Sequence, residues 1–185
     1  MEFNKVIQER HSVRKFKAKE PDWRDIIEAI DSARYAPMAG NNFSLKFILV
    51  NEKEKLKRLA EATQQPFVED VKYILVVCTV PSRTTLAYEE RAQRYLPQQA
   101  GAAIQNILLK ITDMGLSTCW VGHFVDTIVK ETLSISEDVT VEALLPIGYE
   151  FKKLTTRKAK IDMDNILYFN KYKNKRLVPP RKPYV

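Results

Sequence analysis

The stretch QQAGAAIQNILLKITDMGLSTCWVGHF, residues 98–124, contains the features on which the expected fold depends. Its first part repeats apolar residues at the i, i+3, i+4 and i+7 spacing of a helix. The repeating residues are Ala100, Ala103, Ile104, Ile107, Leu108, Ile111 and Met114. Ala102 and Leu109 add apolar surface outside this stripe, so we expect a helix that is buried on most of its circumference. After a candidate C-cap at Gly115, residues 116–121 are typical of a buried strand that ends at Gly122.

The length and composition indicate one domain with a proper core. The chain has 185 residues, of which 45% are apolar. It contains no run of 18 apolar residues, and its first residues, MEFNKVIQERHSVRKF, lack the apolar centre of a signal peptide. We therefore expect no membrane span and a cytoplasmic location. Cys78 and Cys119 lie in apolar, strand-like runs and are expected to be buried thiols.

Other periodic segments predict a sheet wrapped by helices. Helices are expected at residues 3–9, 52–63, 84–96, 125–133 and near 162–169, and strands at 45–50, 71–80 and 139–147. One more helix is expected between Pro21-Asp22 and Pro37. Its predicted apolar stripe is Trp23, Ile26, Ile27, Ile30 and Ala33. Pro97 is expected to separate the polar helix at 84–96 from the core helix.

These elements predict an α+β fold. Its central sheet is expected to be mixed or antiparallel, with about four strands and a possible further strand from a partner chain.

The charge pattern is less specific. The formal net charge is +7, and basic residues concentrate at 10–19 and 157–182. Such segments are either solvated surface or contacts to an anionic partner, which could be nucleic acid, a membrane surface or a phosphate-bearing small molecule.

Several common catalytic motifs are missing from the sequence. The only histidines are His11 and His123, and no His or Cys cluster has the spacing of a metal site. No G-x-x-x-x-G-K-[ST], G-x-G-x-x-G or G-x-S-x-G sequence is present, and no helix-turn-helix with a basic recognition helix is visible. We infer that an enzyme built on this chain would take its chemistry from a cofactor.

One short segment does carry candidate ligand-binding groups. Arg10, Ser12 and Arg14 alternate, so in an extended chain their side chains point the same way. Two guanidinium groups around a hydroxyl can hold a phosphate or an electron-rich ring edge, although a charged surface turn has the same composition.

Other candidates each have an ordinary structural explanation beside the functional one. Asn41 could bind a ligand or serve a turn, and Gly122 could expose backbone to a flat ring or simply end a strand. Lys158 and Lys160 could reach a phosphate or be surface lysines. Gln99, at the start of the core helix, could face a site or be solvated.

Taken together, the sequence resembles the FMN-dependent nitroreductase family over nearly the whole chain to about Tyr172. Four segments carry the resemblance in the family's order: RHSVRKF at 10–16, ARYAPMAGN at 33–41, the 101–122 region, and LPIGY at 145–149. The resemblance implies a homodimer with two FMN sites at the subunit interface. It also implies one FMN-binding domain over residues 1–172. The basic, proline-containing tail at 173–185 lies outside the resemblance.

The resemblance further implies roles for individual residues. Arg10 and Ser12 would hold the ribityl chain and phosphate, with backbone or ring contacts from His11. Arg14 would lie near the pyrimidine edge, where reduction places negative charge. The remaining implied contacts come from Pro37, Met38 and Asn41 of the partner subunit, from the backbone at Val121 and Gly122 near the flavin N5 atom, and from Lys158 and Lys160 at the phosphate.

No catalytic side chain is implied, because hydride chemistry belongs to the flavin. NADH or NADPH would reduce it, and a small acceptor such as a nitroaromatic or quinone would reoxidise it in a ping-pong cycle. Residues 84–96 fall in a region that varies within the family and are a candidate substrate lid. The alternatives are a dehalogenating or flavin-consuming relative, an FMN-binding module without turnover, and a basic nucleic-acid-binding protein.

Overall fold

A computed structural model describes residues 1–81, 83–152 and 161–177. The chain divides into two compact units, Met1–Lys152 and Lys153–Val185. The second unit contains one short described helix, α7 (Met163–Ile166). Within the described ranges, no helix is both long enough and apolar enough to cross a membrane. The cytoplasmic location and the single FMN-binding domain over residues 1–172 stay predictions.

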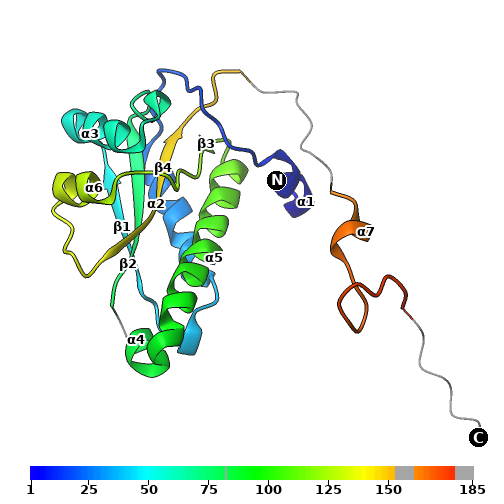
Figure 1. The fold of residues 1–185 in the computed structure, drawn as a ribbon. Helices are drawn as coiled ribbons and strands as arrows, with labels where there is room; N and C mark the ends of the chain where they lie inside the picture. Colours follow the sequence, from blue (N-terminus) through cyan, green and yellow to red (C-terminus); the bar gives the residue numbers. More distant parts are fainter. Residues whose placement is uncertain (82, 153–160, 178–185) are drawn as a thin grey trace, which may run out of the picture. The chain divides into compact units, whose positions relative to one another are not determined.

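The centre of the first unit is a four-stranded antiparallel sheet in the order β1-β2-β4-β3 (Figure 1). Its strands are β1 (Leu45–Val50), β2 (Tyr73–Thr79), β3 (Ser117–Thr118) and β4 (Thr140–Gly148). This confirms the predicted α+β class and shows the sheet to be antiparallel. Every residue of β2 is buried, as its apolar sequence predicts for a central strand.

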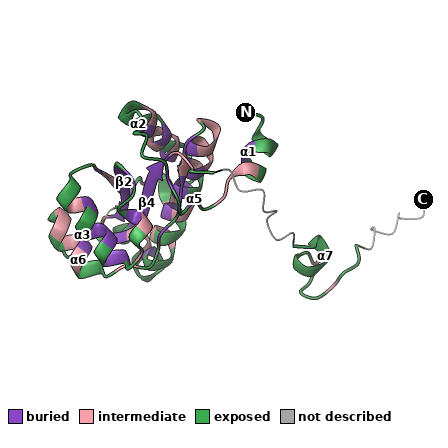
Figure 2. Cartoon of the chain, turned by 90° about the horizontal axis from the view of Figure 1, so that it is seen from above, coloured by how far each residue is buried: buried purple, intermediate pink, exposed green. Residues whose placement is uncertain are grey.

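Helices cover both faces of this sheet, as Figures 1 and 2 show. On one face, Tyr73, Leu75 and Val77 of β2 pack with α2 (Trp23–Asp31) and α5 (Ala92–Asp113). On the other face, the alternate β2 residues pack with α3 (Lys53–Thr63) and α6 (Asp126–Leu133). The alternation of a strand therefore separates two apolar clusters, one on each side of the sheet.

Helix α5 is the predicted core helix, but it begins earlier than expected. Its apolar stripe is buried from Ala100 to Ile111 as predicted, and Ile104, Ile107 and Ile111 are each 0% exposed. Met114, the last residue of the predicted stripe, is half-buried. The expectation that Pro97 ends a separate helix is wrong, because α5 starts at Ala92 and continues through Pro97. Pro97 is exposed, and so is Gln93, whose carbonyl lacks a helical N–H donor there. Water can solvate that carbonyl, so the proline is tolerated.

Two further sequence predictions need correction. Trp23 and Ile27 are 48% and 47% exposed rather than part of the buried stripe of α2, which instead buries Ile26 and Ala29. The α2 stripe is narrower than predicted because only one side of the helix meets the sheet. The strand expected at 116–121 pairs as β3 over two residues only, with a separate bridge from Val121 to Leu144.

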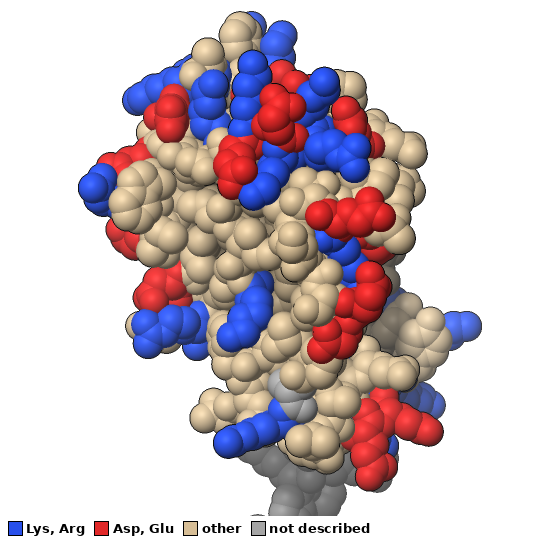
Figure 3. Space-filling model, turned by 90° about the vertical axis from the view of Figure 1, so that its left-hand side faces the viewer, with Lys and Arg blue, Asp and Glu red and all other residues tan. Residues whose placement is uncertain are grey.

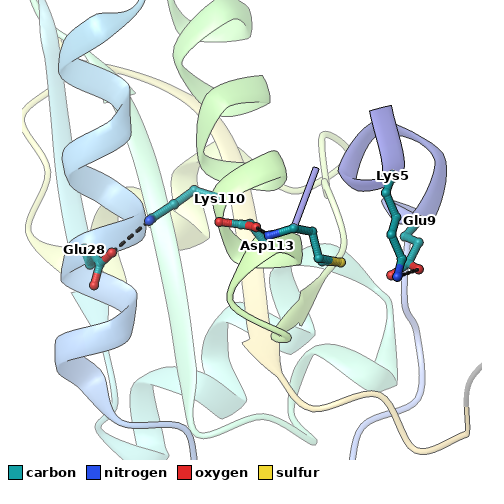
Figure 4. A network of polar contacts seen from close by, with 6 residues as sticks. Lys5, Glu9, Glu28, Lys110 and Asp113 are labelled. Atoms are coloured by element: carbon teal, nitrogen blue, oxygen red, sulfur yellow. Dashed lines mark hydrogen bonds and ion pairs between the residues drawn. The ribbon is translucent and has the colours of Figure 1, made fainter. Parts of the chain in front are cut away.

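The remaining elements connect this core. Helix α1 (Phe3–Glu9) lies beside the C-terminal end of α5, where the amino group of Met1 contacts Asp113 (Figure 4). Lys110 of α5 contacts Glu28 of α2 at 2.8 Å. The region predicted as a polar helix at 84–96 is α4 (Arg83–Tyr88), a 3-10 turn (Glu89–Arg91) and the first turn of α5. Other 3-10 turns are Ser32–Tyr35, Ala39–Asn41 and Pro66–Val68.

Candidate functional site

The segment containing Arg10, Ser12 and Arg14 is attached to the edge of the sheet at β3. The backbone N–H of Val13 donates to the carbonyl of Thr118 at 3.0 Å, and Phe151 donates to the carbonyl of Lys15 at 2.9 Å. The segment is extended, as predicted, and it connects the β3 edge with the chain that follows β4. Three of the four motifs that the sequence singled out therefore meet at one place.

Buried apolar side chains hold this polar segment in position. Val13 and Phe16 are 3% and 7% exposed. Phe16 packs over Gly148, where an added Cβ atom would lie 3.0 Å from Phe16 Cδ1. Gly148 is thus required for the close approach of the aromatic ring to the end of β4. The anchored apolar residues leave Ser12 and Arg14 exposed and Arg10 half-buried.

The three polar residues lie near enough to the buried thiol of Cys119 to influence its pKa. Burial raises the pKa of Cys119, and Arg14, a hydrogen bond from Ser12 and the charge of Arg10 act in the opposite direction. Nearby, the buried hydroxyl of Thr118 has no hydrogen-bond partner within the described ranges. Two cations and two hydroxyl groups at one sheet edge are a donor set that fits a phosphate-bearing ligand.

His11 has a structural role that the sequence did not reveal. Its Nε2 atom lies 2.9 Å from Glu150 Oε1, and its Nδ1 atom lies 2.8 Å from the carbonyl oxygen of Glu9. Both ring nitrogens therefore hold the segment to its neighbours in the chain. Of the two kinds of ligand contact predicted for His11, the backbone contact is compatible with these hydrogen bonds.

Val121 and Gly122, the residues predicted to contact the flavin through their backbone, differ in exposure. Val121 is 2% exposed, and its N–H and carbonyl both hydrogen-bond to Leu144 at 3.0 Å. Gly122 is exposed and follows the paired residue directly. The indole of Trp120 lies beside Gly122. Trp120 is 40% exposed, and its Nε1 atom is 3.8 Å from where a Cβ atom on Gly122 would lie. Sequence reasoning had not selected Trp120.

The loop of Pro37, Met38 and Asn41 lies against other elements, namely α4 and the N-terminal half of α5. Gly40 and Asn41 have φ of +59° and +55°, and a Cβ atom on Gly40 would be 3.1 Å from the Tyr88 hydroxyl. Asparagine tolerates this left-handed backbone, which accounts for Asn41 in the turn. The side chains of Pro37 and Asn41 are exposed. The structure therefore places the candidate residues in two groups. Arg10, Ser12 and Arg14 lie at the β3 edge, and Pro37, Met38 and Asn41 lie against α4 and α5.

Gln99 holds this loop from α5. Its Oε1 atom accepts a hydrogen bond from the backbone N–H of Ala39 at 3.1 Å, and the residue is 4% exposed. The explanation of Gln99 as a solvated side chain is therefore wrong. The other predicted residues, Lys158 and Lys160, lie outside the described residues.

Metal and nucleic-acid sites can be compared with the described residues and with the face shown in Figure 3. No group of three or more His, Cys, Asp or Glu residues in the described ranges could hold a metal ion. On the face shown in Figure 3, basic and acidic side chains are interspersed. A shallow depression is lined by Glu54, Lys55, Arg58 and Glu131. A nucleic-acid interface needs clustered positive charge, which this face does not present.

The fold is that of an α+β protein with a four-stranded antiparallel sheet, and the candidate residues Arg10, Ser12 and Arg14 lie at its β3 edge. The model of the nitroreductase family matches residues 7–67 and 60–149, and the chain belongs to this family.

Individual relatives agree with that assignment. A nitroreductase family protein of Clostridium novyi NT is 28% identical, with a TM-score of 0.74 over 94% of this chain and 96% of that one. The NADPH:FMN oxidoreductase of Vibrio harveyi, solved with NAD+, has the same fold: TM-score 0.82 and 21% identity over 93% of this chain and 78% of that one. The iodotyrosine deiodinase of Thermotoga neapolitana is 26% identical over 78% of this chain and 86% of that protein.

The contact between Gly148 and Phe16 can be tested by Gly148→Ala. The new methyl group would push Phe16 out of its site, so we expect a loss of about 1–3 kcal/mol in the free energy of unfolding, measured by chemical denaturation. Gly101→Ala is the matched control, because its Cβ atom would meet nothing closer than 3.8 Å. If the Gly148 variant is as stable as wild type, Phe16 does not anchor the segment as described.

Proposed function

We propose that this protein is an FMN-dependent oxidoreductase that takes hydride from NADH or NADPH and passes it to a small acceptor, such as a nitroaromatic or quinone, in a ping-pong cycle. The observation that carries the proposal is that the segment with Arg10, Ser12 and Arg14 pairs with β3 at the sheet edge, shortly before the exposed Gly122 in the chain that leaves β3. Membership of the nitroreductase family and the similarity to a protein named NADPH:FMN oxidoreductase support the same cofactors.

The residues present fit FMN at this edge. Arg10 and Ser12 would hold the phosphate and ribityl chain, together with Lys158 and Lys160. His11 would act through its backbone while its ring orients the segment on Glu150. Arg14 would lie near the pyrimidine edge of the flavin, where a fixed cation stabilises the negative charge that arises on reduction.

FMN, when bound, supplies the hydride-transfer chemistry. The protein's own contribution is binding, orientation and electrostatics, and no acid or base side chain is needed. The hydrogen bonds between Val121 and Leu144 fix the backbone that leads to Gly122. Because Gly122 has no side chain, a flat ring could approach its backbone. The exposed indole of Trp120 would form part of the rim of the site.

We propose that the complete site needs a second copy of the chain. Pro37, Met38 and Asn41 are held on α4 and α5, whereas Arg10, Ser12 and Arg14 are held on β3. A homodimer would bring the loop of one subunit to the sheet edge of the other. The exposed apolar side chains of Phe3 (68%) and Tyr35 (79%) are surface that such an interface could cover.

A second candidate reaction uses the same site with a different acceptor. The similarity to a protein named iodotyrosine deiodinase favours reductive dehalogenation of an aromatic acceptor. The two reactions differ in product, because only dehalogenation releases halide. Incubation with a halogenated phenol, followed by halide analysis, separates them.

The oxidoreductase assignment predicts a reducible flavin. Protein reconstituted with FMN should lose its flavin absorbance when NADH or NADPH is added without oxygen, because hydride is transferred to the flavin. A nitroaromatic or quinone should then restore the absorbance. A bound flavin that neither nucleotide bleaches would contradict the proposal and favour a binding role without turnover.

The phosphate assignment predicts that Arg10→Ala combined with Lys158→Ala weakens FMN retention. Loss of two charged contacts should cost roughly 2–4 kcal/mol of binding, while the circular dichroism spectrum stays that of the folded protein. Lys53→Ala with Lys57→Ala removes the same charge from α3 and serves as the control. FMN content equal to wild type in the first variant would refute the assignment.

A further inference from the structure

The ring of His11 lies between two hydrogen-bond acceptors. Its Nδ1 atom is 2.8 Å from the carbonyl oxygen of Glu9, and its Nε2 atom is 2.9 Å from Glu150 Oε1. A carbonyl and a carboxylate can only accept, so both bonds form together only when each ring nitrogen carries a proton. A neutral imidazole has a single N–H, and the lone pair of its other nitrogen would face an oxygen atom. The geometry therefore fits a charged His11 ring.

The carboxylate of Glu150 is well placed to hold this ring. On one side of it, the N–H of Phe151 donates to the carbonyl of Lys15 at 2.9 Å. On the other side, the carbonyl of Tyr149 accepts from the N–H of Lys17 at 2.8 Å. The Glu150 side chain is 13% exposed, and the histidine side chain is 28% exposed. Water and salt screen such a partly buried pair less than an exposed one, so the charged ring and the carboxylate stabilise each other.

The surroundings of the ring contain other charged groups. Besides Glu150, the elements next to His11 carry side chains of types that ordinarily keep their charge between about pH 5.5 and pH 8. They are Lys5 and Glu9 of α1, Arg10 and Arg14 of the same segment, Asp113 of α5, and Lys15 and Lys152. Lys5 and Glu9 pair with each other at 3.9 Å, and Asp113 pairs with the amino group of Met1 (Figure 4). Histidine is the side-chain type here whose ordinary titration falls in that range.

We propose that His11 and Glu150 are positioning residues for the FMN-binding segment, and that the proton on the His11 ring controls how tightly FMN is held. The charged ring holds the segment to α1 and to the chain after β4 at once. The neutral ring keeps only one of the two bonds, so Arg10 and Ser12, on either side of it, are held less firmly. FMN therefore binds more tightly at the acid end of the range in which histidine titrates. The inference rests on the proposed function, because it takes this segment as the FMN site.

The first test compares the FMN affinity of wild type and His11→Gln from about pH 8 to about pH 5.5, by flavin fluorescence. Glutamine can place an amide N–H near the position of Nε2 and keep the contact with Glu150, but it does not titrate. The ratio of the two affinities should change by at least about fivefold in favour of wild type as the pH falls, which is an ordinary coupling between two sites. Taking the ratio removes the titration of the FMN phosphate and of the Met1 amino group. His123→Gln removes the only other histidine of the chain and should keep the wild-type pH dependence.

The second test separates positioning from direct attraction between His11 and the FMN phosphate. Glu150→Gln keeps an oxygen that accepts from the ring but removes the charge. Loss of a negative charge near an anionic ligand would by itself strengthen binding. If Glu150 positions the segment, the variant should instead bind FMN about threefold more weakly at pH 6, because the charge-assisted bond is lost. Glu61→Gln, at an exposed position of α3, removes the same charge and should bind FMN as wild type does.

The third test follows the His11 ring itself by nitrogen-15 nuclear magnetic resonance of the wild-type protein, which needs no variant that folds. Because coupling is reciprocal, FMN should shift the titration of the His11 ring to higher pH.

Three results would overturn the proposal. They are an affinity ratio that is constant over this pH range, FMN binding by folded Glu150→Gln that equals or exceeds that of wild type, and a His11 titration that FMN leaves unchanged. Failure of the proposed function is separate, because it would appear as wild-type protein that binds no FMN at any pH, or as a bound flavin that neither nucleotide bleaches.

Discussion

The structure depends on the burial of α5 against the sheet and α2. Because Ala103, Ile104, Ile107 and Ile111 are all 0% exposed, the helix has one position relative to the sheet. Both candidate groups of the site are attached to it. Near its N-terminal end, Gln99 holds the 37–41 loop, and beyond its C-terminal end Gly115, with φ of +76°, turns the chain toward β3. The packing of one helix thereby determines where the two groups of candidate ligand-binding residues lie.

The polar segment at Arg10–Arg14 shows how charged residues are held in position at the edge of a β-sheet. Its cations make few contacts of their own, and the order of the segment comes from Val13 and Phe16 beneath it and from the His11–Glu150 hydrogen bond. Such preorganisation matters for a cofactor enzyme, since groups that are already in place need no reordering when charge develops on a ligand. It also explains why Gly148 and Glu150, which carry no chemistry themselves, belong to the site.

The sequence was sufficient for features with strong local signals. The periodicity of α5, the apolar run of β2 and the alternation of Arg10, Ser12 and Arg14 each reflect one element, so each could be predicted. The failures concern tertiary contacts. Pro97 was expected to separate two helices, but α5 continues through it, and Gln93, whose carbonyl loses its helical donor, is an exposed residue. The burial of Gln99 and the pairing of Val121 with Leu144 depend on residues 60 and 23 positions away in the chain, which local patterns do not reveal.

The most direct test of the two-chain site is a mixed dimer. Arg10→Ala with Arg14→Ala removes one group, and Pro37→Glu with Asn41→Asp makes the other repel an anionic flavin. Each variant alone should lose FMN. Co-expressed with different affinity tags and purified through both, the mixed dimer should regain one flavin per dimer, because one of its two sites then combines the intact groups. A mixed dimer that binds no flavin, although both variants are folded, would contradict a site assembled from two chains.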